Sequence, residues 1–131
     1  MDCDDKTIAF YSVSNDLLRI GANFSREFKS FLKQNISNEI LYELLDWDNF
    51  PAVKLDMLAV HEDFHRSKIG TVLMESILYN FSTNNKTGCF FVTADALNTK
   101  KAISFYEFHE FKFLSKYDSS KKSVMMYRSL L

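Results

Sequence analysis

Apolar and polar positions alternate with a period of two near the start of the chain, which predicts β-strands. The stretch "TIAFYSVS", residues 7–14, is rich in β-branched and aromatic residues and is expected to form a strand. Asn15-Asp16 is typical of a turn, and the "LLRIG" stretch, residues 17–21, predicts a short second strand. We therefore expect a β-hairpin over residues 7–21.

Helical spacing follows in the segment up to residue 50. Apolar residues at i, i+4, i+7 and i+8 mark one face of a helix over residues 24–32, with Ser25 as a possible N-cap. A second stripe over residues 40–45 follows Ser37. These patterns predict two helices, or one helix broken near residues 35–37, that end at Phe50-Pro51.

The stretch "AVKLDMLAVHE", residues 52–62, predicts a strand whose apolar phase changes. Its apolar positions are first Val53, Leu55 and Met57, and then Leu58 and Val60. This change has two explanations that the pattern leaves open. It indicates either a β-bulge near Met57-Leu58 or a strand that is covered on both faces.

The second half of the chain alternates helices and strands. A helical stripe begins at Ile69, a buried strand is expected in "GCFFVTADA", and a helix of about three turns in "NTKKAISFYEFHEF". A closing hairpin is expected from "FKFLSKY" and "KSVMMYRSL", with its turn at "DSSK". Few glycines, a single proline and the absence of repeats favour one domain over residues 1–131.

Composition narrows the class of protein. Apolar residues make up 47% of the 131, enough for a sizeable core, and the net charge is −1. Residues 1–52 carry 5 Lys/Arg and 9 Asp/Glu, whereas residues 53–131 carry 11 and 8. This mildly basic second part suits a phosphate-bearing ligand but is too weak to predict nucleic-acid binding. The acidic start lacks the apolar region of a signal peptide. No apolar run is long enough to span a membrane. The two cysteines suggest free thiols in a reducing cytoplasm.

A short polar run precedes the helix that begins at Ile69. It contains Arg66 and Lys68 and stops at Ile69-Gly70. A strand, a polar loop with glycine and a helix N-terminus together favour an anion, because free backbone N–H groups and the helix dipole point at it. A solvated loop explains the same spacing. The P-loop and dinucleotide-binding spacings are both absent.

Two segments resemble the GNAT N-acetyltransferases. The stretch "LAVHEDFHRSKIGTVLMESIL" is similar to the acetyl-CoA-binding segment, which runs from a strand through Q/R-x-x-G-x-G/A into a helix. His65 takes the Q/R place, Lys68 the first glycine place and Gly70 the second. The stretch "TADALNTKKAISFYEFHEFKF" is similar to the family's later strand and its A-x-x-F-Y-x-x-x-G-F helix. The matching residues are Asn98, Ala102, Phe105, Tyr106 and Phe111, and Glu110 stands in place of the glycine.

The resemblance implies an α+β, three-layer fold with a central mixed, mostly antiparallel twisted sheet flanked by helices. The predicted hairpin at residues 7–21 would be the family's second and third strands, and the family's first strand and two helices would be missing. The chain would then be truncated at the N-terminus, and an exposed sheet edge would favour a homo-oligomer or another protein partner.

The resemblance also implies acetyl transfer from acetyl-CoA, as a cosubstrate and without a metal, to an amine. The backbone of Leu58, Ala59 and Val60 would pair with the pantetheine arm. The pyrophosphate would be surrounded by His65, Arg66, Ser67, Lys68, Ile69, Gly70 and Thr71. Tyr106 would give a proton to the leaving thiolate, although a half-buried core tyrosine is the ordinary alternative. Asn98 would contact CoA, cap the helix, or do both.

Other candidates are weaker. His61, Glu62 and Asp63 stand where a general base could lie but also suit a solvated loop, and His109 suits a helix surface. The two histidines at 61 and 65 lack a third metal ligand, and Cys89 suits a core position. Two alternatives remain beside a general N-acetyltransferase: a truncated module that binds CoA or a partner without catalysis, and a toxin that acetylates aminoacyl-tRNA. The net charge makes nucleic acid the less favoured partner, and the acceptor amine cannot be read from the sequence.

Overall fold

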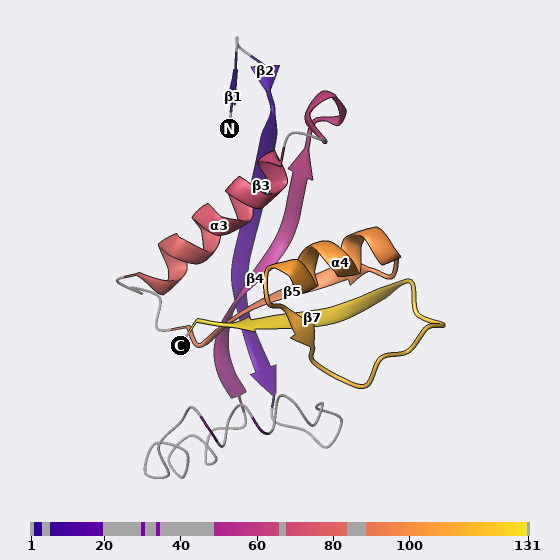
Figure 1. Cartoon of the computed structure of the whole chain (residues 1–131). Helices are drawn as coiled ribbons and strands as arrows, with labels where there is room; N and C mark the ends of the chain where they lie inside the picture. Colours follow the sequence, from indigo (N-terminus) through magenta and orange to yellow (C-terminus); the bar gives the residue numbers. More distant parts are fainter. Residues whose placement is uncertain are drawn as a thin grey trace.

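The computed structural model describes residues 2–3, 6–19, 30, 34, 49–65, 68–83 and 89–130. The helices expected over residues 24–32 and 40–45 lie outside the described residues. Figure 1 shows the described part as strands crossed by two longer helices. None of the described helices is long and apolar enough to cross a membrane.

A mixed sheet of five strands forms the centre of the described chain. The strands are β3 (Ala9–Arg19), β4 (Asn49–Val60), β5 (Phe91–Leu97), β6 (Lys112–Phe113) and β7 (Ser123–Ser129). Their order is β3-β4-β5-β7-β6, and every neighbouring pair is antiparallel except β4 and β5. The short strands β1 (Asp2–Cys3) and β2 (Lys6–Thr7) pair separately. The predicted α+β class with a mixed, mostly antiparallel sheet is confirmed.

The predicted hairpin at residues 7–21 is wrong. Strand β3 runs without a break through Asn15 and Asp16 and pairs along its length with β4. Asp16 accepts a hydrogen bond from the backbone of Leu17 at 2.8 Å and from the hydroxyl of Thr93 at 3.1 Å. Its carboxylate therefore has partners inside an extended strand, and no turn is needed to satisfy it. Pro51 also lies within β4 and does not follow a helix.

The phase change in β4 is a β-bulge. Ser12 is opposite Met57 but Val13 is opposite Leu55, so Asp56 is one extra residue on β4. The register shifts there, and the side chains after it change faces. The bulge, one of two explanations for the sequence pattern, thus lies one residue before its expected position.

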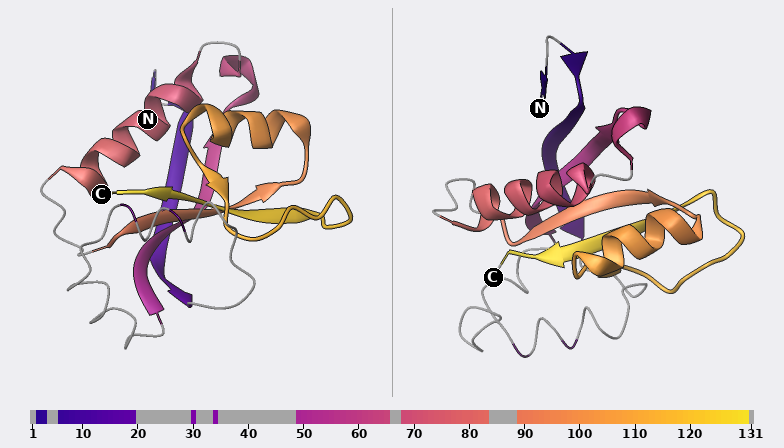
Figure 2. Two further views of the ribbon diagram at one scale, coloured as in Figure 1. Left: turned by 60° about the horizontal axis from the view of Figure 1, so that its bottom comes forward. Right: turned by 45° about the horizontal axis from the view of Figure 1, so that its top comes forward.

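Two helices cover one face of the sheet. Helix α3 (Ile69–Ser82) follows β4 and the short helix η1 (Glu62–Phe64), while α4 (Lys100–Phe108) follows β5. Figure 2 shows the two helices beside each other across the strands. Leu73, Met74 and Ile77 of α3 are buried in one core with residues of β4, β5 and β7. A helical layer on the other face would fall on residues outside the described ones.

The closing hairpin has the predicted strands, but the first is short. β6 contains only Lys112 and Phe113, which pair with Tyr127 and Met126 of β7. The connection between β6 and β7 is long and follows the outer side of the sheet, as Figure 1 shows.

Candidate functional site

The two parallel strands separate at the middle of the sheet. Strands β4 and β5 pair from Ala52 with Phe91 to Leu55 with Ala94, and the pairing ends there. β4 then passes through the bulge at Asp56 and stays with β3, while β5 continues to Leu97 beside β7. The bulge bends β4, so its last residues leave an edge that β5 does not cover.

Backbone groups of Leu58 and Val60 point to this edge. The His61 N–H donates to the Ile8 carbonyl, which makes that opposed pair hydrogen-bonded. In an antiparallel ladder such pairs alternate with non-hydrogen-bonded ones. Ala59, two residues earlier, therefore turns its N–H and C=O toward β3. Leu58 and Val60 turn theirs away from β3, toward the space that β5 leaves.

The N-terminus of α3 lies directly after β4 and has no side-chain cap. Lys68 is the N-cap residue, and its own side chain makes no capping hydrogen bond. The amides of Ile69, Gly70 and Thr71 belong to the first turn, where N–H groups have no partner within the helix. The geometry suits an anion. Arg66 and Ser67 lie outside the described residues.

Lys68 has a left-handed backbone, with φ 61° and ψ 20°. Glu110 has φ 67°, and these two are the only non-glycine residues of positive φ in the described part of the chain. Both are the positions where the motifs carry glycine. Both positions therefore require a left-handed backbone, which this chain forms with Lys68 and Glu110 at a cost of about 1–2 kcal/mol each.

His65 fastens the start of this turn to the end of β4. Its Nε2 lies 2.7 Å from the Val60 carbonyl oxygen, and because a carbonyl only accepts, the ring must donate. Histidine, glutamine and arginine all carry a side-chain N–H donor. The departure from Q/R at this place therefore preserves the donor.

Gly70 lies in close contact with both β4 and α4. A Cβ there would lie 3.6 Å from Val60 and 3.6 Å from the ring of Phe105. That is ordinary contact for a methyl group and leaves no room for a longer side chain. Gly70 thus brings together the end of β4, the start of α3 and the Phe105-Tyr106 pair of α4.

Tyr106 is held by the C-terminal motif of α4. The N–H of Phe111 donates to the Tyr106 carbonyl at 3.0 Å, and that of Glu110 to the Glu107 carbonyl at 2.9 Å. This is the Schellman pattern, which usually includes an apolar contact across the same residues. The rings of Tyr106 and Phe111 supply it, with centroids 5.3 Å apart. Arg128 donates to the His109 carbonyl at 2.7 Å and secures the same helix end.

Burial raises the pKa of the Tyr106 hydroxyl above its ordinary value near 10. The phenol therefore keeps its proton at neutral pH. The ring packs against the same core as Leu58 and Val60, and its hydroxyl has no hydrogen-bond partner among the described residues. A protonated hydroxyl without a partner in this part of the chain can donate to a ligand.

Asn98 does not cap α4. The N-cap is Thr99, whose hydroxyl accepts from the Ala102 N–H at 3.2 Å. The Asn98 amide instead donates to the Lys121 carbonyl at 2.8 Å and accepts from the Tyr117 hydroxyl at 2.9 Å. Asn98 therefore fixes the β6–β7 connection to the end of β5.

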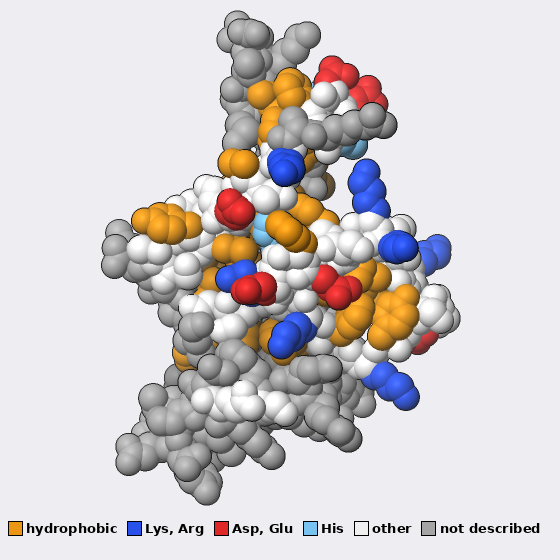
Figure 3. Space-filling view, in the orientation of Figure 1, with side chains coloured by type: hydrophobic (Ala, Val, Ile, Leu, Met, Phe, Trp, Pro, Cys, Tyr) orange, Lys and Arg blue, Asp and Glu red, His pale blue; other side chains and the backbone are white. Residues whose placement is uncertain are grey.

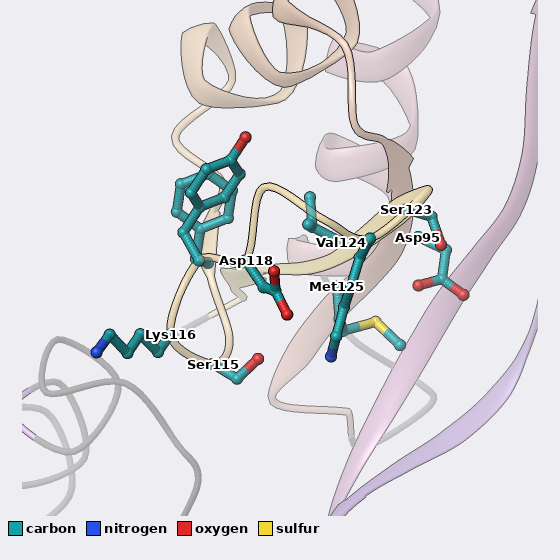
Figure 4. Close-up of a pocket in the computed structure, with 10 residues that line it drawn as sticks. Asp95, Ser115, Lys116, Asp118, Ser123, Val124 and Met125 are labelled. Carbon is teal, nitrogen blue, oxygen red and sulfur yellow. The ribbon is translucent and has the colours of Figure 1, made fainter.

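A hollow of about 160 Å³ lies under that connection. Asp95 lines this hollow and lies one residue after the point where β4 and β5 separate. Because successive side chains of a strand point to opposite faces, the Asp95 side chain points away from the core residues Ala94 and Ala96. Figure 4 shows Asp95 on one side of the hollow and Lys116 on the other. This hollow could not be predicted from the sequence, because its lining comes from strand ends and a loop that the fold alone brings together. A larger, open hollow of about 530 Å³ lies at the end of α4 beside β7.

His109 is buried, so its expected place on the helix surface is wrong. Its ring packs on Phe105 at 4.9 Å between centroids, and its Nε2 has no partner among the described residues. Burial is the main cause that lowers the pKa of His109, with Glu75 raising it and Arg128 lowering it further. The ring has a packing role and is neutral near pH 7.

The remaining candidates are exposed or buried without visible chemistry. The Nδ1 of His61 accepts from the Asp63 N–H at 3.2 Å and caps η1. Because Nδ1 accepts this hydrogen bond, it has no proton to donate to the Asp63 carboxylate, which lies 3.6 Å away. The contact between His61 and Asp63 is therefore a helix cap. Within the described ranges no group of three His, Cys, Asp or Glu side chains is placed to hold a metal. Cys89 is buried.

The surface over the two helices carries mixed charge. Figure 3 shows apolar, acidic and basic side chains interspersed on this face, with Lys and Arg more frequent toward α4 and the chain after it. Residues 100–122 contain six lysines against three acidic residues. This end of the molecule is thus the more basic one.

The separated parallel strands, the bulge and the uncapped helix define the class of this domain. The chain matches the family described as "Acetyltransferase (GNAT) domain" over residues 31–113, more than half of its length. It therefore belongs to the GNAT acetyltransferase family. Among curated proteins, none has a sequence that matches this chain.

Solved structures with the same fold include several toxins. A structure described as a bacterial toxin has a TM-score of 0.66 and 17% identity, covering 94% of this chain and 60% of its own. A mutant of KacT has a TM-score of 0.65 and 16% sequence identity, and the match covers 94% of this chain and 62% of the KacT chain. AtaT complexed with acetyl-methionyl-tRNAfMet has a TM-score of 0.64 and 15% sequence identity, and the match covers 93% of this chain and 62% of the AtaT chain. The chain thus spans about three fifths of the length of these toxins, and the likeness shows a shared fold.

Proposed function

We propose that the protein is an N-acetyltransferase that moves an acetyl group from acetyl-CoA to an amine by direct attack. The observation that carries this proposal is the open edge of β4 at Leu58, beside the uncapped N-terminus of α3 and the core that holds Tyr106. The arm of acetyl-CoA would pair with the backbone of Leu58 and with the N–H of Val60, because the Val60 carbonyl already accepts from His65. Its pyrophosphate would meet the amides of Ile69 and Gly70. A related solved structure, AtaTR, was determined with acetyl-CoA.

The chemistry requires a neutral amine, a polarised thioester carbonyl and a proton for the leaving group. The amine nitrogen forms a bond to the carbonyl carbon, the C–S bond breaks, and Tyr106 gives its proton to the thiolate sulfur. The proton that the amine nitrogen loses passes to water, and a proton from water restores the Tyr106 phenol. Backbone N–H groups on the open edge of β4 would stabilise the developing oxyanion. The hollow beside Asp95 lies on the other face of the sheet, where the amine would enter without crossing the CoA arm.

The test of this proposal is acetyl-CoA binding by calorimetry, followed by turnover of the Tyr106→Phe variant. The variant keeps the ring and its contact with Phe111, so binding should be unchanged. Loss of a general acid should slow turnover about 10²–10⁴-fold. If the variant weakens acetyl-CoA binding as much as it slows turnover, Tyr106 is a packing residue. If the wild-type protein binds no acetyl-CoA, the proposal fails.

A second candidate concerns the acceptor, and the basic end of the molecule favours it. AtaT was solved with acetyl-methionyl-tRNAfMet, and the lysines of residues 100–122 give this chain a surface for phosphates. Acetylation of an aminoacyl-tRNA therefore competes with acetylation of a free amine or peptide. An acceptor panel at two salt concentrations separates them, because only a tRNA acceptor should lose rate steeply with salt.

We also infer association with a second protein chain. β3 is at the edge of the sheet that the described residues form, and Leu17 on this strand and Tyr79 on α3 are 60% and 66% exposed. Exposed apolar side chains beside a strand edge favour a partner. AtaT was solved with the C-terminus of the antitoxin AtaR. A stable monomer in sedimentation at high concentration, alone and with candidate partners, would argue against this inference.

A further inference from the structure

The His109 side chain is a buried polar group without a hydrogen-bond partner. The residue is 5% exposed, and its Nε2 atom makes no hydrogen bond within the part of the chain that the structure describes. A buried polar atom that lacks a partner lowers stability, so its presence needs a physical explanation. The neighbours of the ring, at the end of α4, supply one.

The ring of His109 packs on Phe105, which joins the two helices of the proposed site. The centroids of these two rings are 4.9 Å apart. Phe105 also lies against Gly70 of α3, where a Cβ atom would be 3.6 Å from its ring. Its centroid is 5.5 Å from that of Tyr106. His109 is therefore one side chain away from both the first turn of α3 and the proposed general acid.

Two charged groups from other elements act on the ring. Burial is the main cause that lowers the pKa of His109, while Glu75 on α3 raises it and Arg128 on β7 lowers it further. Arg128 lies 3.3 Å from the Glu110 carboxylate, and Glu75 is exposed at the surface of α3. A proton on the ring is therefore favoured by movement toward Glu75 and water, away from Phe105 and Arg128.

The backbone of His109 is fixed independently of its ring. Its N–H donates to the Tyr106 carbonyl at 3.1 Å, and its carbonyl accepts from Arg128 at 2.7 Å. Rotation about the side-chain torsions of His109 therefore moves the ring and leaves the end of α4 in place. The contact with Phe105 is the part that such a rotation breaks.

We propose that His109 is a positioning residue whose neutral ring holds Phe105 against Gly70 in the arrangement that binds acetyl-CoA, and whose protonation releases Phe105. This rests on the proposed function, in which acetyl-CoA contacts both α3 and the core that holds Tyr106. The ligand then favours the packed, neutral ring. By linkage, a proton on His109 weakens acetyl-CoA binding, and acetyl-CoA lowers the pKa of His109 by the same factor.

The pH range of the effect follows from the direction of the shift. Because the pKa of His109 in the folded protein lies below its ordinary value of 6.5, the ring is neutral above that pH. Acetyl-CoA affinity that depends on the neutral ring is thus fully present there. It is lost as the pH falls through the pKa of the ligand-free protein.

NMR titration of the imidazole signals tests the proposal in the wild-type chain. The sequence contains three histidines, so the signal that is missing from His109→Phe identifies His109. Titration from about pH 8 to about pH 5, with and without saturating acetyl-CoA, should give His109 a lower pKa when the ligand is bound. The negative charge of the ligand acts through space in the opposite direction, so the sign of the change separates packing from direct electrostatics.

Calorimetry of the whole chain with acetyl-CoA at about pH 7.5 and about pH 5 measures the consequence for affinity. His109→Phe keeps an aromatic ring beside Phe105 but takes up no proton. Between the two pH values, wild-type affinity should fall about 3- to 10-fold more than that of His109→Phe, within the limit for one proton. Titration of the ligand phosphates and of His65 is common to both proteins and cancels in this ratio.

Two more variants serve as controls in the same measurement. His61→Asn removes an exposed imidazole that caps η1 and should keep the wild-type loss of affinity. Glu75→Gln removes the carboxylate that raises the pKa of His109, so it should move the loss to lower pH. Thermal melting at both pH values shows that each variant is folded.

Three results would overturn the role of His109 while acetyl-CoA binding by the wild type stands. These are a His109 pKa that acetyl-CoA leaves unchanged or raises, equal pH dependence in the wild type and His109→Phe, and a wild-type profile in Glu75→Gln. If His109→Phe does not fold, His61→Asn and His65→Gln identify the remaining signal, and the NMR titration decides. A wild-type protein that binds no acetyl-CoA at either pH overturns the proposed function as well.

Discussion

Glu110 has a backbone conformation that favours glycine, so glycine should be more stable than alanine at this position. Its φ of 67° follows the C-cap of α4, at the position where helices often place a left-handed glycine. Its side chain makes an ion pair with Arg128 at 3.3 Å and is 78% exposed. Glu110→Gly removes both the strain and the ion pair, while Glu110→Ala removes only the ion pair.

The difference between the two variants isolates the Cβ atom. A left-handed backbone costs a residue with a Cβ about 1–2 kcal/mol. Glycine gives back ~0.4–1 kcal/mol, because it increases the conformational entropy of the unfolded chain. Glu110→Gly should therefore exceed Glu110→Ala by about 0.5–1 kcal/mol in free energy of unfolding. Both variants lose the exposed ion pair with Arg128, which lowers the free energy of unfolding of each by about 0–1 kcal/mol.

The assay is urea unfolding with thermal melting of both variants and of a matched pair at Glu107. Glu110→Gly should melt about 2–5 °C above Glu110→Ala. Glu107 lies inside the same helix, where glycine should be less stable than alanine by about 0.5–1 kcal/mol. The sign of the glycine effect should thus reverse within three residues. If Glu110→Ala equals or exceeds Glu110→Gly in stability, the left-handed turn does not govern this helix end.

Two further predictions concern Lys68 and His109. Lys68→Gly should be more stable than Lys68→Ala by about 0.5–1 kcal/mol, as measured by urea unfolding. If the lysine charge contributes to pyrophosphate binding, both variants should lose acetyl-CoA affinity equally in calorimetry. Because burial lowers the pKa of His109 in the folded protein, the unfolded chain takes up this proton first as pH falls below about 6.5. Stability should fall there by at most ~1.4 kcal/mol per pH unit, and His109→Leu should remove that part of the slope measured by thermal melting from pH 7.5 to 5.

The sequence predicted most strands and helices of the second half because their apolar periods match one buried face. β5, α3 and α4 lie where the pattern places them. The hairpin prediction at residues 7–21 failed because β3 stays extended through Asn15 and Asp16 and pairs there with β4. There, polar residues such as Asn15 remain exposed, and Asp16 finds a hydroxyl on Thr93, 77 residues away. A local propensity for a turn carries no information about such a distant partner.

The site was predictable as a motif but not as a set of contacts. The pattern located the turn before α3 and the Phe105-Tyr106 pair, whose roles stay predictions. It could not show that Thr99 caps α4 while Asn98 fastens a loop, because both residue types are good caps. It also could not show that His109 packs inward at the end of α4. The ring is placed there by the Schellman turn, whose left-handed residue is a glutamate instead of the expected glycine.

The departures from the family motif do not argue by themselves against catalysis. Lys68 and Glu110 stand where glycine is expected, yet each has the left-handed backbone that makes glycine favourable there. The geometry is thus kept at a cost in stability, and the core and the Arg128 contacts with the end of α4 can offset it. His65 stands where Gln or Arg is expected and still donates to β4. Each departure thus preserves the backbone conformation or the hydrogen-bond donor that its position requires.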